Sequence, residues 1–392
     1  MTTPDNEFDA IIVGGGVVGC SMGFAAANLG ARVLLLEQNT LGSGISSNTF
    51  AWANATAKPS DKDYFDLNWT GLNHHHQLAE RFGAENTGLH ASSMVEWTSE
   101  SNMTRLNEMQ ARYQLLAEAG YGSHWLNREQ LQSYLPNVTL EKDAVGMHSP
   151  RDAWVDIPKF ISFLATQITS AGGVILEHCG AERFLQDENG EVIGVQTPQG
   201  MFYSEITIIC SGQHTPDTVA ALADHDAFAS RFPMQRVPGI MLKTPPLPES
   251  AQLHTIVYAS HDHSVHMRPT PDGGLLIGDD EVDGWISMQT SEQDIVKARK
   301  TLLSRAKHYL REIPDSLQFD QCEFGIGIRA VPNDDHTIVG TLPGSNNAYV
   351  VCTHSGVTLC LFLAELMIQS VSQGQLVKRL APYSFNRFNP EK

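Results

Sequence analysis

Residues 8–39, FDAIIVGGGVVGCSMGFAAANLGARVLLLEQN, decide the fold of this chain. The run 8–13 is apolar and ends at a glycine, which is typical of a buried parallel strand. Residues 17–29 are small and compatible with a helix, and 33–36 form a second apolar run. Strand, glycine turn, helix and strand in this order predict a βαβ unit, and therefore an α/β fold built on a parallel sheet.

The turn of this unit, GGGVVG at residues 14–19, matches the pattern GxGxxG. Gly14 permits the tight turn, Gly16 lets the backbone approach a pyrophosphate, and Gly19 lets the helix pack closely on the strand. The first N–H groups of the helix, at Val17 and Val18, carry a partial positive charge that suits phosphates. The motif predicts a dinucleotide site, and the alternative is a glycine-rich turn that binds no ligand.

Glu37 ends the second strand and lies 23 positions after Gly14. A carboxylate there can accept hydrogen bonds from both hydroxyls of an adenosine ribose, and it would repel the 2′-phosphate of NADP. The segment after it, NTLGSGISSNTFAWANA at residues 39–55, is small, polar and glycine-rich. A compact NAD-binding unit returns sooner to a third strand. This long loop therefore favours an extended cofactor, FAD, over NAD.

Composition excludes several classes of protein. The chain has 392 residues, 42% of them hydrophobic, which indicates two or three domains with a sizeable core. Its net charge of -18 opposes nucleic-acid binding, because phosphate needs a basic surface. No basic segment precedes the first apolar run, and the apolar runs are too short to span a bilayer, so we expect a cytoplasmic protein and no integral membrane segment. The six cysteines are scattered without a CxxC pair and are expected to be reduced thiols: Cys20, Cys179, Cys210, Cys322, Cys352 and Cys360.

The rest of the chain alternates between helical and strand-like stretches. Helical spacing occurs at 64–82, 103–119, 158–171 and 297–311, and a β-rich stretch covers roughly 172–212. Near the C-terminus, 349–353 reads as a buried strand and 357–368 as a buried helix. No repeat or low-complexity linker marks a boundary, so we expect domains that interleave.

Taken together, these motifs resemble the superfamily of flavoproteins that includes D-amino-acid oxidase, glycine oxidase and sarcosine oxidase. Residues 9–38 resemble its FAD fingerprint, and GSGISSNTF at 42–50 resembles its small-residue loop along the pyrophosphate and ribityl chain. DAWVDIPKF at 152–160 resembles its Asp-Pro entry to a helix. GIGIRAVPNDDHTIVG at 325–340 and THSGVTLC at 353–360 resemble its final arginine and H-x-G elements. GGVILEHCGAERF at 172–184 resembles the strand whose backbone meets adenine, and ITIICSGQHT at 206–215 the strand that ends at a glycine turn.

The resemblance implies an α/β fold (α+β overall) in which a GR2-type, Rossmann-like FAD-binding domain is interleaved with an antiparallel-sheet substrate domain. We assign 1–83, 146–218 and 325–392 to the first domain, and 84–145 and 219–324 to the second. The early loop lacks a histidine and the final arginine motif lacks a cysteine, so FAD is expected to bind non-covalently. The residues expected to contact FAD are Gly14, Gly16, Val17, Val18, Gly19, Glu37, Gln38, Ile45, Ser46, Ser47, Asn48, Phe50, Ala51, Ala181, Ser211, Gly212, Arg329, His354, Ser355, Gly356, Val357 and Thr358.

The implied reaction is oxidation of the Cα–N bond of a D-amino acid, a glycine-like, an N-alkyl or a cyclic amino acid. A hydride passes to flavin N5 and the resulting imine is hydrolysed. In the sarcosine oxidase branch a lysine helps to activate oxygen, and the corresponding place here is Leu276. A dehydrogenase that passes electrons to a quinone or carrier is therefore one alternative. The others are a non-catalytic flavoprotein subunit, a tRNA-modifying relative and a plain NAD dehydrogenase. The expected partners are the amine substrate and oxygen or a carrier, and homo-oligomers are left open.

Arg329 is the first candidate for chemistry, because a guanidinium can hold a substrate carboxylate with two parallel hydrogen bonds. The alternative is a structural ion pair with one of the many nearby acids, such as Asp334 or Asp335. Strand alternation in SVHMR puts His266 and Arg268 on one face, which either lines the substrate cavity or forms a solvated edge. Trp52 either walls the pocket or belongs to the core.

The stretch CTHSGVTLC at 352–360 is interpreted as a strand end, a turn at His354-Ser355-Gly356 and a helix start. The positive helix terminus would lie beneath the flavin N1–C2 carbonyl. Two histidine groups suggest metal binding at first sight, His74 to His76 and the pair His261 and His263. Neighbouring residues on a helix point about 100° apart, and the pair lacks a third ligand, so no metal site is predicted.

Overall fold

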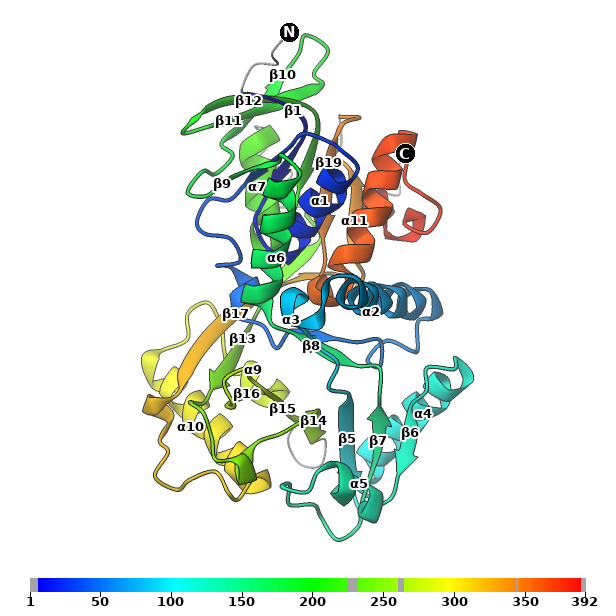
Figure 1. The fold of residues 1–392 in the computed structure, drawn as a ribbon, viewed down its shortest axis with the longest axis vertical. Helices are drawn as coiled ribbons and strands as arrows, with labels where there is room; N and C mark the ends of the chain where they lie inside the picture. Colours follow the sequence, from blue (N-terminus) through cyan, green and yellow to red (C-terminus); the bar gives the residue numbers. More distant parts are fainter. Residues whose placement is uncertain (1–5, 224–231, 260–263, 343–344, 389–392) are drawn as a thin grey trace.

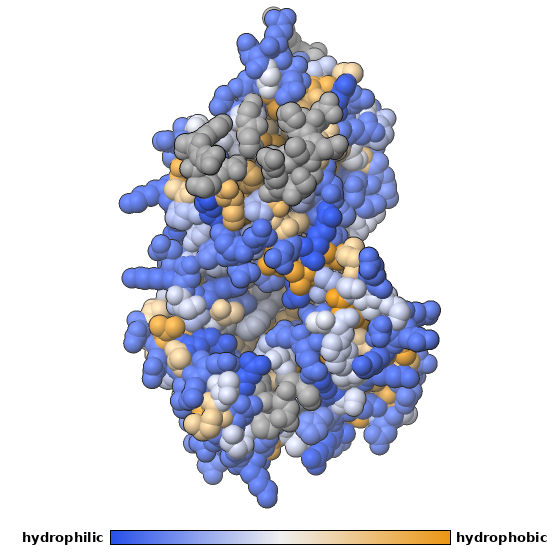
Figure 2. Space-filling view, turned by 180° about the vertical axis from the view of Figure 1, so that it is seen from behind, coloured by the Kyte–Doolittle hydropathy of each residue, from blue (hydrophilic) through white to orange (hydrophobic). Residues whose placement is uncertain are grey.

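The computed structural model describes residues 6–223, 232–259, 264–342 and 345–388. Two lobes lie end to end with a narrower waist between them (Figure 1). Each lobe is built on its own large sheet, and the chain passes between the lobes several times. The face drawn in Figure 2 is mostly hydrophilic, with some hydrophobic residues gathered near the waist.

The first sheet has a parallel centre in the order β9-β2-β1-β12-β19. β2 and β19 are buried along their whole length, as the inner strands of a covered sheet are, whereas β1 and β12 are exposed near their starts. β18 is antiparallel to β19, and β10 and β11 extend one edge of β12 as an antiparallel ribbon. The strands are β1 (Glu7–Val13), β2 (Val33–Leu36), β9 (Val174–Leu176), β10 (Arg183–Gln186), β11 (Val192–Thr197), β12 (Gly200–Ile209), β18 (Ile338–Thr341) and β19 (Ala348–Cys352).

The helices of the first lobe pack through small residues. α1 (Val17–Asn28) lies between α6 (Ile157–Ser170) and α11 (Gly356–Gln373), and α11 also packs on α2 (Lys62–Phe82). α11 is long and apolar enough to cross a bilayer by length and composition alone, and 56% of it is buried in the protein. The same lobe carries α3 (Ala84–Thr87) and α7 (Thr215–Ala223).

The second sheet has the order β17-β13-β16-β15-β14-β5-β7-β6 and is antiparallel except between β14 and β5. α10 and α4 cover it, and a small sheet of β3, β8 and β4 lies at the waist. The strands are β3 (Trp52–Ala53), β4 (Leu89–His90), β5 (Met94–Ser99), β6 (His124–Leu126), β7 (Ala144–Ser149), β8 (Ala153–Val155), β13 (Met234–Lys243), β14 (Ile256–Ala259), β15 (Val265–Pro269), β16 (Leu275–Asp279) and β17 (Glu323–Pro332). The helices are α4 (Met103–Glu118), α5 (Arg128–Tyr134), α9 (Asp280–Asp283) and α10 (Glu292–Tyr309).

The boundaries drawn from the sequence at 146 and 325 fall inside two strands of the second sheet, β7 and β17. Assigned by sheet, the segments would change lobe after 149 and after 332 instead. β17 carries the glycine and arginine motif as one long strand, and its ten residues pair with β13 from end to end. The motif therefore reaches the first lobe from the second sheet.

α10 starts five residues earlier than the sequence pattern indicates, because Ser291 caps a polar first turn that shows no apolar period.

Candidate functional site

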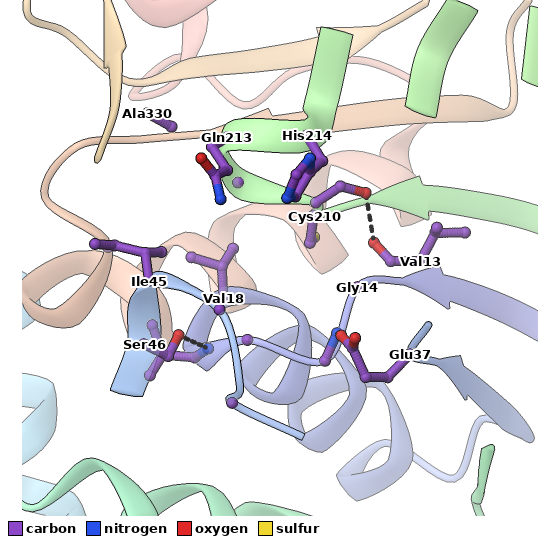
Figure 3. A pocket seen from close by; sticks show the side chains of 18 of the residues that line it. Val13, Gly14, Val18, Glu37, Ile45, Ser46, Cys210, Gln213, His214 and Ala330 are labelled. Atoms are coloured by element: carbon purple, nitrogen blue, oxygen red, sulfur yellow. Dashed lines mark hydrogen bonds between the residues drawn. The ribbon is translucent and has the colours of Figure 1, made fainter. Parts of the chain in front are cut away.

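The first cavity lies at the carboxyl ends of the parallel strands, with a volume of about 420 Å³. Its floor is the glycine turn after β1 (Figure 3). Gly14 has φ +110°, and a Cβ there would lie 2.6 Å from the carbonyl oxygen of Cys210. A Cβ on Gly19 would lie 1.8 Å from the oxygen of Gly14, so this residue serves packing behind the turn and does not line the cavity.

The start of α1 opens into this cavity. Its N-cap is Gly16, which has no side chain to satisfy the first N–H groups. Ser46, on the 3₁₀ turn η1 (Ile45–Ser47), accepts a hydrogen bond of 3.2 Å from the N–H of Val17 (Figure 3). Val18 and Ile45 line the same wall. A bare helix terminus against a small-residue loop is the environment that a pyrophosphate needs.

Glu37 is held at the end of β2 by the backbone. Its Oε2 accepts from the N–H of Gly15 at 2.7 Å, and its Oε1 accepts from the N–H of Asn39 at 2.8 Å. Each carboxylate oxygen keeps a second lone pair for a hydroxyl. Gln38 and Ala181 lie beside it in the lining. These groups fit the ribose and adenine end of a dinucleotide.

The opposite wall of the first cavity comes from Ser211, Gly212, Arg329, His354, Gly356 and Val357. The second cavity, about 430 Å³, adjoins it at the waist and shares five residues with it: Ile45, Thr49, Arg329, His354 and Val357. Five residues expected to contact the cofactor line only this second cavity: Asn48, Phe50, Ala51, Ser355 and Thr358. Ser47 lines neither, because its hydroxyl donates to the carbonyl of Gly42.

The two adjoining cavities match an extended cofactor with a substrate beside it. The glycine turn, the bare helix terminus and the ribose-facing carboxylate fit the ADP part of FAD. With the ADP part in the first cavity, the flavin ring would lie at the junction between the two cavities. The residues present therefore fit the cofactor that the motifs imply.

Arg329 lies at that junction, on β17. Its Nη2 is 3.1 Å from Oδ2 of Asp283, and Nε and Nη2 point at the carbonyls of Val237 and Pro238, each at 3.4 Å. Asp283 also accepts from the N–H of Ile240 at 2.8 Å. Burial raises the pKa of Asp283, although Ile240 and Arg329 oppose that shift.

Arg329 does form an ion pair with an acid, as the alternative expected, but Asp334 is not that acid, because it binds Arg387. For Arg329 the structure records an ion pair with Asp283.

His266 and Trp52 both line the second cavity, as parts of an aromatic wall with Phe50 and Tyr258. The rings of His266 and Tyr258 stack at 5.5 Å, and Phe50 meets His266 edge-on at 4.7 Å. β15 is not a solvated edge strand, because β15 lies inside the sheet between β14 and β16.

Arg268 is not part of that wall and does not line either cavity. Its Nε donates to the carbonyl of Phe50 at 2.6 Å, and its guanidinium lies 4.3 Å from the Trp154 ring centre. Burial lowers its pKa to about 9. Alternation predicts which residues share a face of a strand, but it does not predict where along that face the cavity ends. His266 and Arg268 are two residues apart, which is roughly 6.6 Å along the strand, so one can line the cavity while the other lies beyond it. Arg268 therefore supports the cofactor loop from behind.

The turn 354–356 is the start of α11, as the sequence indicates. Ser355 is the N-cap and makes no capping bond with its side chain. His354 lines both cavities, and burial, with Lys58 and Arg329 nearby, lowers its pKa to about 4, so it is neutral at pH 7. The hydroxyl of Thr358 accepts from the N–H of Asn54 at 3.2 Å. Cys352 and Cys360 are buried thiols whose pKa burial raises to about 12.

The histidines at 74–76 contact three different groups. His74 binds Glu365, His75 donates to the carbonyl of Val357 at 2.7 Å, and His76 to that of Arg151. His75 thus supports the first turn of α11. His261 and His263 lie outside the described residues. No metal-binding cluster of histidine, cysteine or acidic residues occurs in the described part of the chain.

Several residues at the second cavity were not found from the sequence. Lys58, Tyr258 and Asp283 line it, and the buried Asp152 holds the segment behind it. Their partners lie far away in the sequence, so spacing carried no signal. Asp152 opens the DAWVD motif, which was read only as a helix entry.

Comparison with known proteins agrees with this geometry. Residues 9–370 match the model of a family described as FAD dependent oxidoreductase, DAO. The chain is 26% identical over 392 residues to a glycine oxidase of Geobacillus kaustophilus, with 97% of each chain covered. It is 27% identical over 217 residues to the mitochondrial sarcosine dehydrogenase of Mus musculus, which covers 52% of this chain and 22% of that protein. The solved glycine oxidase from Geobacillus kaustophilus has the same fold, with a TM-score of 0.77 at 24% identity over 97% of this chain and 99% of that one.

Proposed function

The chain belongs to the DAO family of FAD-dependent oxidoreductases, and on that premise we propose that it oxidises the Cα–N bond of an amino acid or secondary amine. FAD, when bound, supplies the acceptor for the hydride that leaves the substrate Cα. The substrate nitrogen gives up a proton, and water hydrolyses the imine product. The substrates that fit this chemistry are D-amino acids and glycine-like, N-alkyl or cyclic amino acids.

Non-covalent attachment of FAD is part of the proposal. The loop along the expected ribityl chain carries Ile45, Ser46, Ser47 and Asn48, and it has no histidine to which a flavin could be attached. The residues flanking Gly327 are both isoleucines.

Arg329 is the residue on which the proposal depends most. It reaches both cavities, and so it can hold a carboxylate in the second cavity while Cα faces the junction. Asp283 and two carbonyls fix one edge of its guanidinium, which leaves other N–H donors for the substrate. His266, Tyr258 and Trp52 would enclose the rest of the substrate.

The α11 terminus and the neutral His354 complete the site. The N–H groups that begin α11 bring a partial positive charge to the edge where reduction places negative charge. Because His354 is neutral at pH 7, it adds no charge and can orient the turn. None of these side chains is needed as a strong base if the amine arrives neutral.

Arg329→Ala tests the proposal. We expect the variant to keep its FAD and its yellow colour, and kcat/KM to fall roughly 100-fold or more, mainly through KM, because a charge-paired carboxylate contact is lost. Anaerobic bleaching of the flavin band by a panel of D-, L-, N-methyl and cyclic amino acids identifies the substrate first. Arg311→Ala is the control, since Arg311 is exposed and lies outside both cavities. A normal kcat/KM in Arg329→Ala would show that Arg329 does not hold the substrate carboxylate.

The electron acceptor is part of the same test. Leu276 lies on β16 opposite Arg268, so no lysine stands at the place where the sarcosine oxidase branch has one. Slow reoxidation by air together with fast reoxidation by a quinone dye would assign the chain as a dehydrogenase, and fast reoxidation by air as an oxidase.

A further inference from the structure

We propose that Lys58 forms a second anion subsite in the second cavity, so that the substrate is a short amino acid with two carboxylates. This inference rests on the proposed function, in which Arg329 holds the first carboxylate. It narrows the substrate class to aminodicarboxylates and N-carboxymethyl amino acids, and away from amines with a single acidic group.

The lysine and arginine side chains that line the second cavity are ion-paired, with one exception. Arg112 binds Glu96, Arg105 lies 3.0 Å from Glu108, and Arg329 lies 3.1 Å from Asp283. Over the described ranges, Lys58 is the cation of this lining for which no carboxylate lies within ion-pair distance. A cation that faces a cavity without a counter-charge is a ready site for an anionic group of the ligand.

The backbone places Lys58 firmly at the cavity wall. It follows β3, and its N–H donates to the carbonyl of Ala55 at 3.0 Å. Its ammonium lies 5.7 Å from the ring centre of Tyr64, on α2. Burial lowers the pKa of this ammonium, and Asp335 opposes that shift. A bound anion would compensate this partly desolvated ammonium for the water it has lost.

Lys58 lies at the same end of the cavity as Arg329. The ammonium of Lys58 lies over the ring of Tyr64, whose hydroxyl is 3.3 Å from Oγ of Ser355. Ser355 follows His354, which lines the cavity junction together with Arg329. The uncapped start of α11 adds its partial positive charge there. The acidic lining residues come from other elements, Glu96 from β5, Glu108 from α4 and Asp280 from α9. Two carboxylates that are close together fit the positive end, whereas a long diacid would reach these acids.

Ligand binding to the holoenzyme tests the subsite without any turnover. Succinate and butyrate have chains of equal length and differ in the second carboxylate. We expect calorimetry to give tighter binding of succinate by the wild type, and Lys58→Met to weaken succinate roughly 10- to 100-fold with butyrate changed less than about twofold. Lys58→Arg should retain most of the preference. Lys62→Met is the matched control, because Lys62 is exposed and lies outside both cavities.

Three results would overturn the subsite. The first is equal binding of succinate and butyrate by the wild type. The second is an equal loss of both ligands in Lys58→Met, which would make Lys58 the site of the first carboxylate. The third is a shift of the flavin midpoint potential in Lys58→Met with the succinate Kd unchanged. Failure of the proposed function is seen separately, since there no amine bleaches the flavin even though the binding titrations can still be measured.

Discussion

At the scale of single residues, two glycines of β17 decide how the cofactor loop meets the second sheet. A Cβ on Gly327 would lie 2.1 Å from the backbone oxygen of Asn48 and 2.4 Å from Cδ1 of Ile45. A Cβ on Gly325 would meet only the side chain of Asn48, with Oδ1 at 1.9 Å. Backbone cannot move aside as a side-chain amide can. The close contact between β17 and the 45–48 loop therefore requires glycine at position 327, whereas position 325 can accept a small side chain.

Gly327→Ala and Gly325→Ala form a matched pair on one face of one strand. We expect Gly327→Ala to push the 45–48 loop out of the first cavity and to weaken FAD binding at least about tenfold, because this change pushes on backbone. Gly325→Ala should bind FAD nearly as well as the wild type, since Asn48 can rotate. Fluorescence titration of apoprotein with FAD gives both constants, and equal losses in the two variants would contradict this reading of the contact.

At the scale of elements, Asp152 clamps the segment 52–58 that carries Trp52 and Lys58. Its carboxyl accepts from Trp52 Nε1 at 3.0 Å, from the Thr56 hydroxyl at 2.9 Å and from the Tyr121 hydroxyl at 2.6 Å. Tyr121 follows α4, which supplies the far wall of the second cavity. The clamp thus couples the two walls of that cavity. Burial raises the pKa of Asp152 to about 7 despite these three donors.

Asp152→Asn tests the clamp through its dependence on pH. The folded pKa of about 7 exceeds the ordinary 3.8, so this carboxyl stabilises the fold fully below about pH 4 and loses that contribution as the pH rises through 7. At pH 5 we expect the variant to be about 1–3 kcal/mol less stable than the wild type, because the amide keeps one acceptor oxygen where the carboxyl has two, and its NH2 group cannot accept a hydrogen bond. Denaturation at several pH values should show the gap narrowing toward pH 8, and a gap that widens would mean that the ionised form is the favoured one.

At the scale of the whole molecule, FAD bridges the two lobes in the proposed complex. The first cavity belongs to the parallel sheet, and the second lies between that lobe and β14, β15, α4 and α9. Five of the described residues line both, and Arg329 is the one among them that comes from the second sheet. A ligand that spans this junction should tie the lobes together.

Removal of FAD is therefore expected to lower the thermal midpoint of unfolding. A ligand that binds only the folded state at a hundred times its Kd adds about 2.7 kcal/mol of stability. Calorimetry of the apoprotein at rising FAD concentrations should show a midpoint that climbs steadily. Acid precipitation should leave the flavin in the supernatant, and flavin that stays with the pellet would contradict non-covalent binding.

The sequence by itself determined the family, the cofactor turn and the broad fold. The glycine turn could be recognised because its requirements are local: Gly14 must adopt a positive φ, and Gly19 must pack on the oxygen of Gly14. The buried parallel strands were also readable, since covered strands are apolar along their whole length. The family prediction from these motifs is confirmed over residues 9–370.

Tertiary structure alone decided which polar residues meet at the second cavity. Strand alternation predicted that His266 and Arg268 share one face, yet of these two only His266 lines the cavity. The pairing of β17 with β13 brings Arg329 to Asp283. Lys58 and His354 line the same cavity although almost 300 positions separate them in the sequence. The physical reason is that backbone conformation depends on residues that are neighbours in the sequence. The partner of a buried charge depends instead on which distant residue the tertiary fold places beside it.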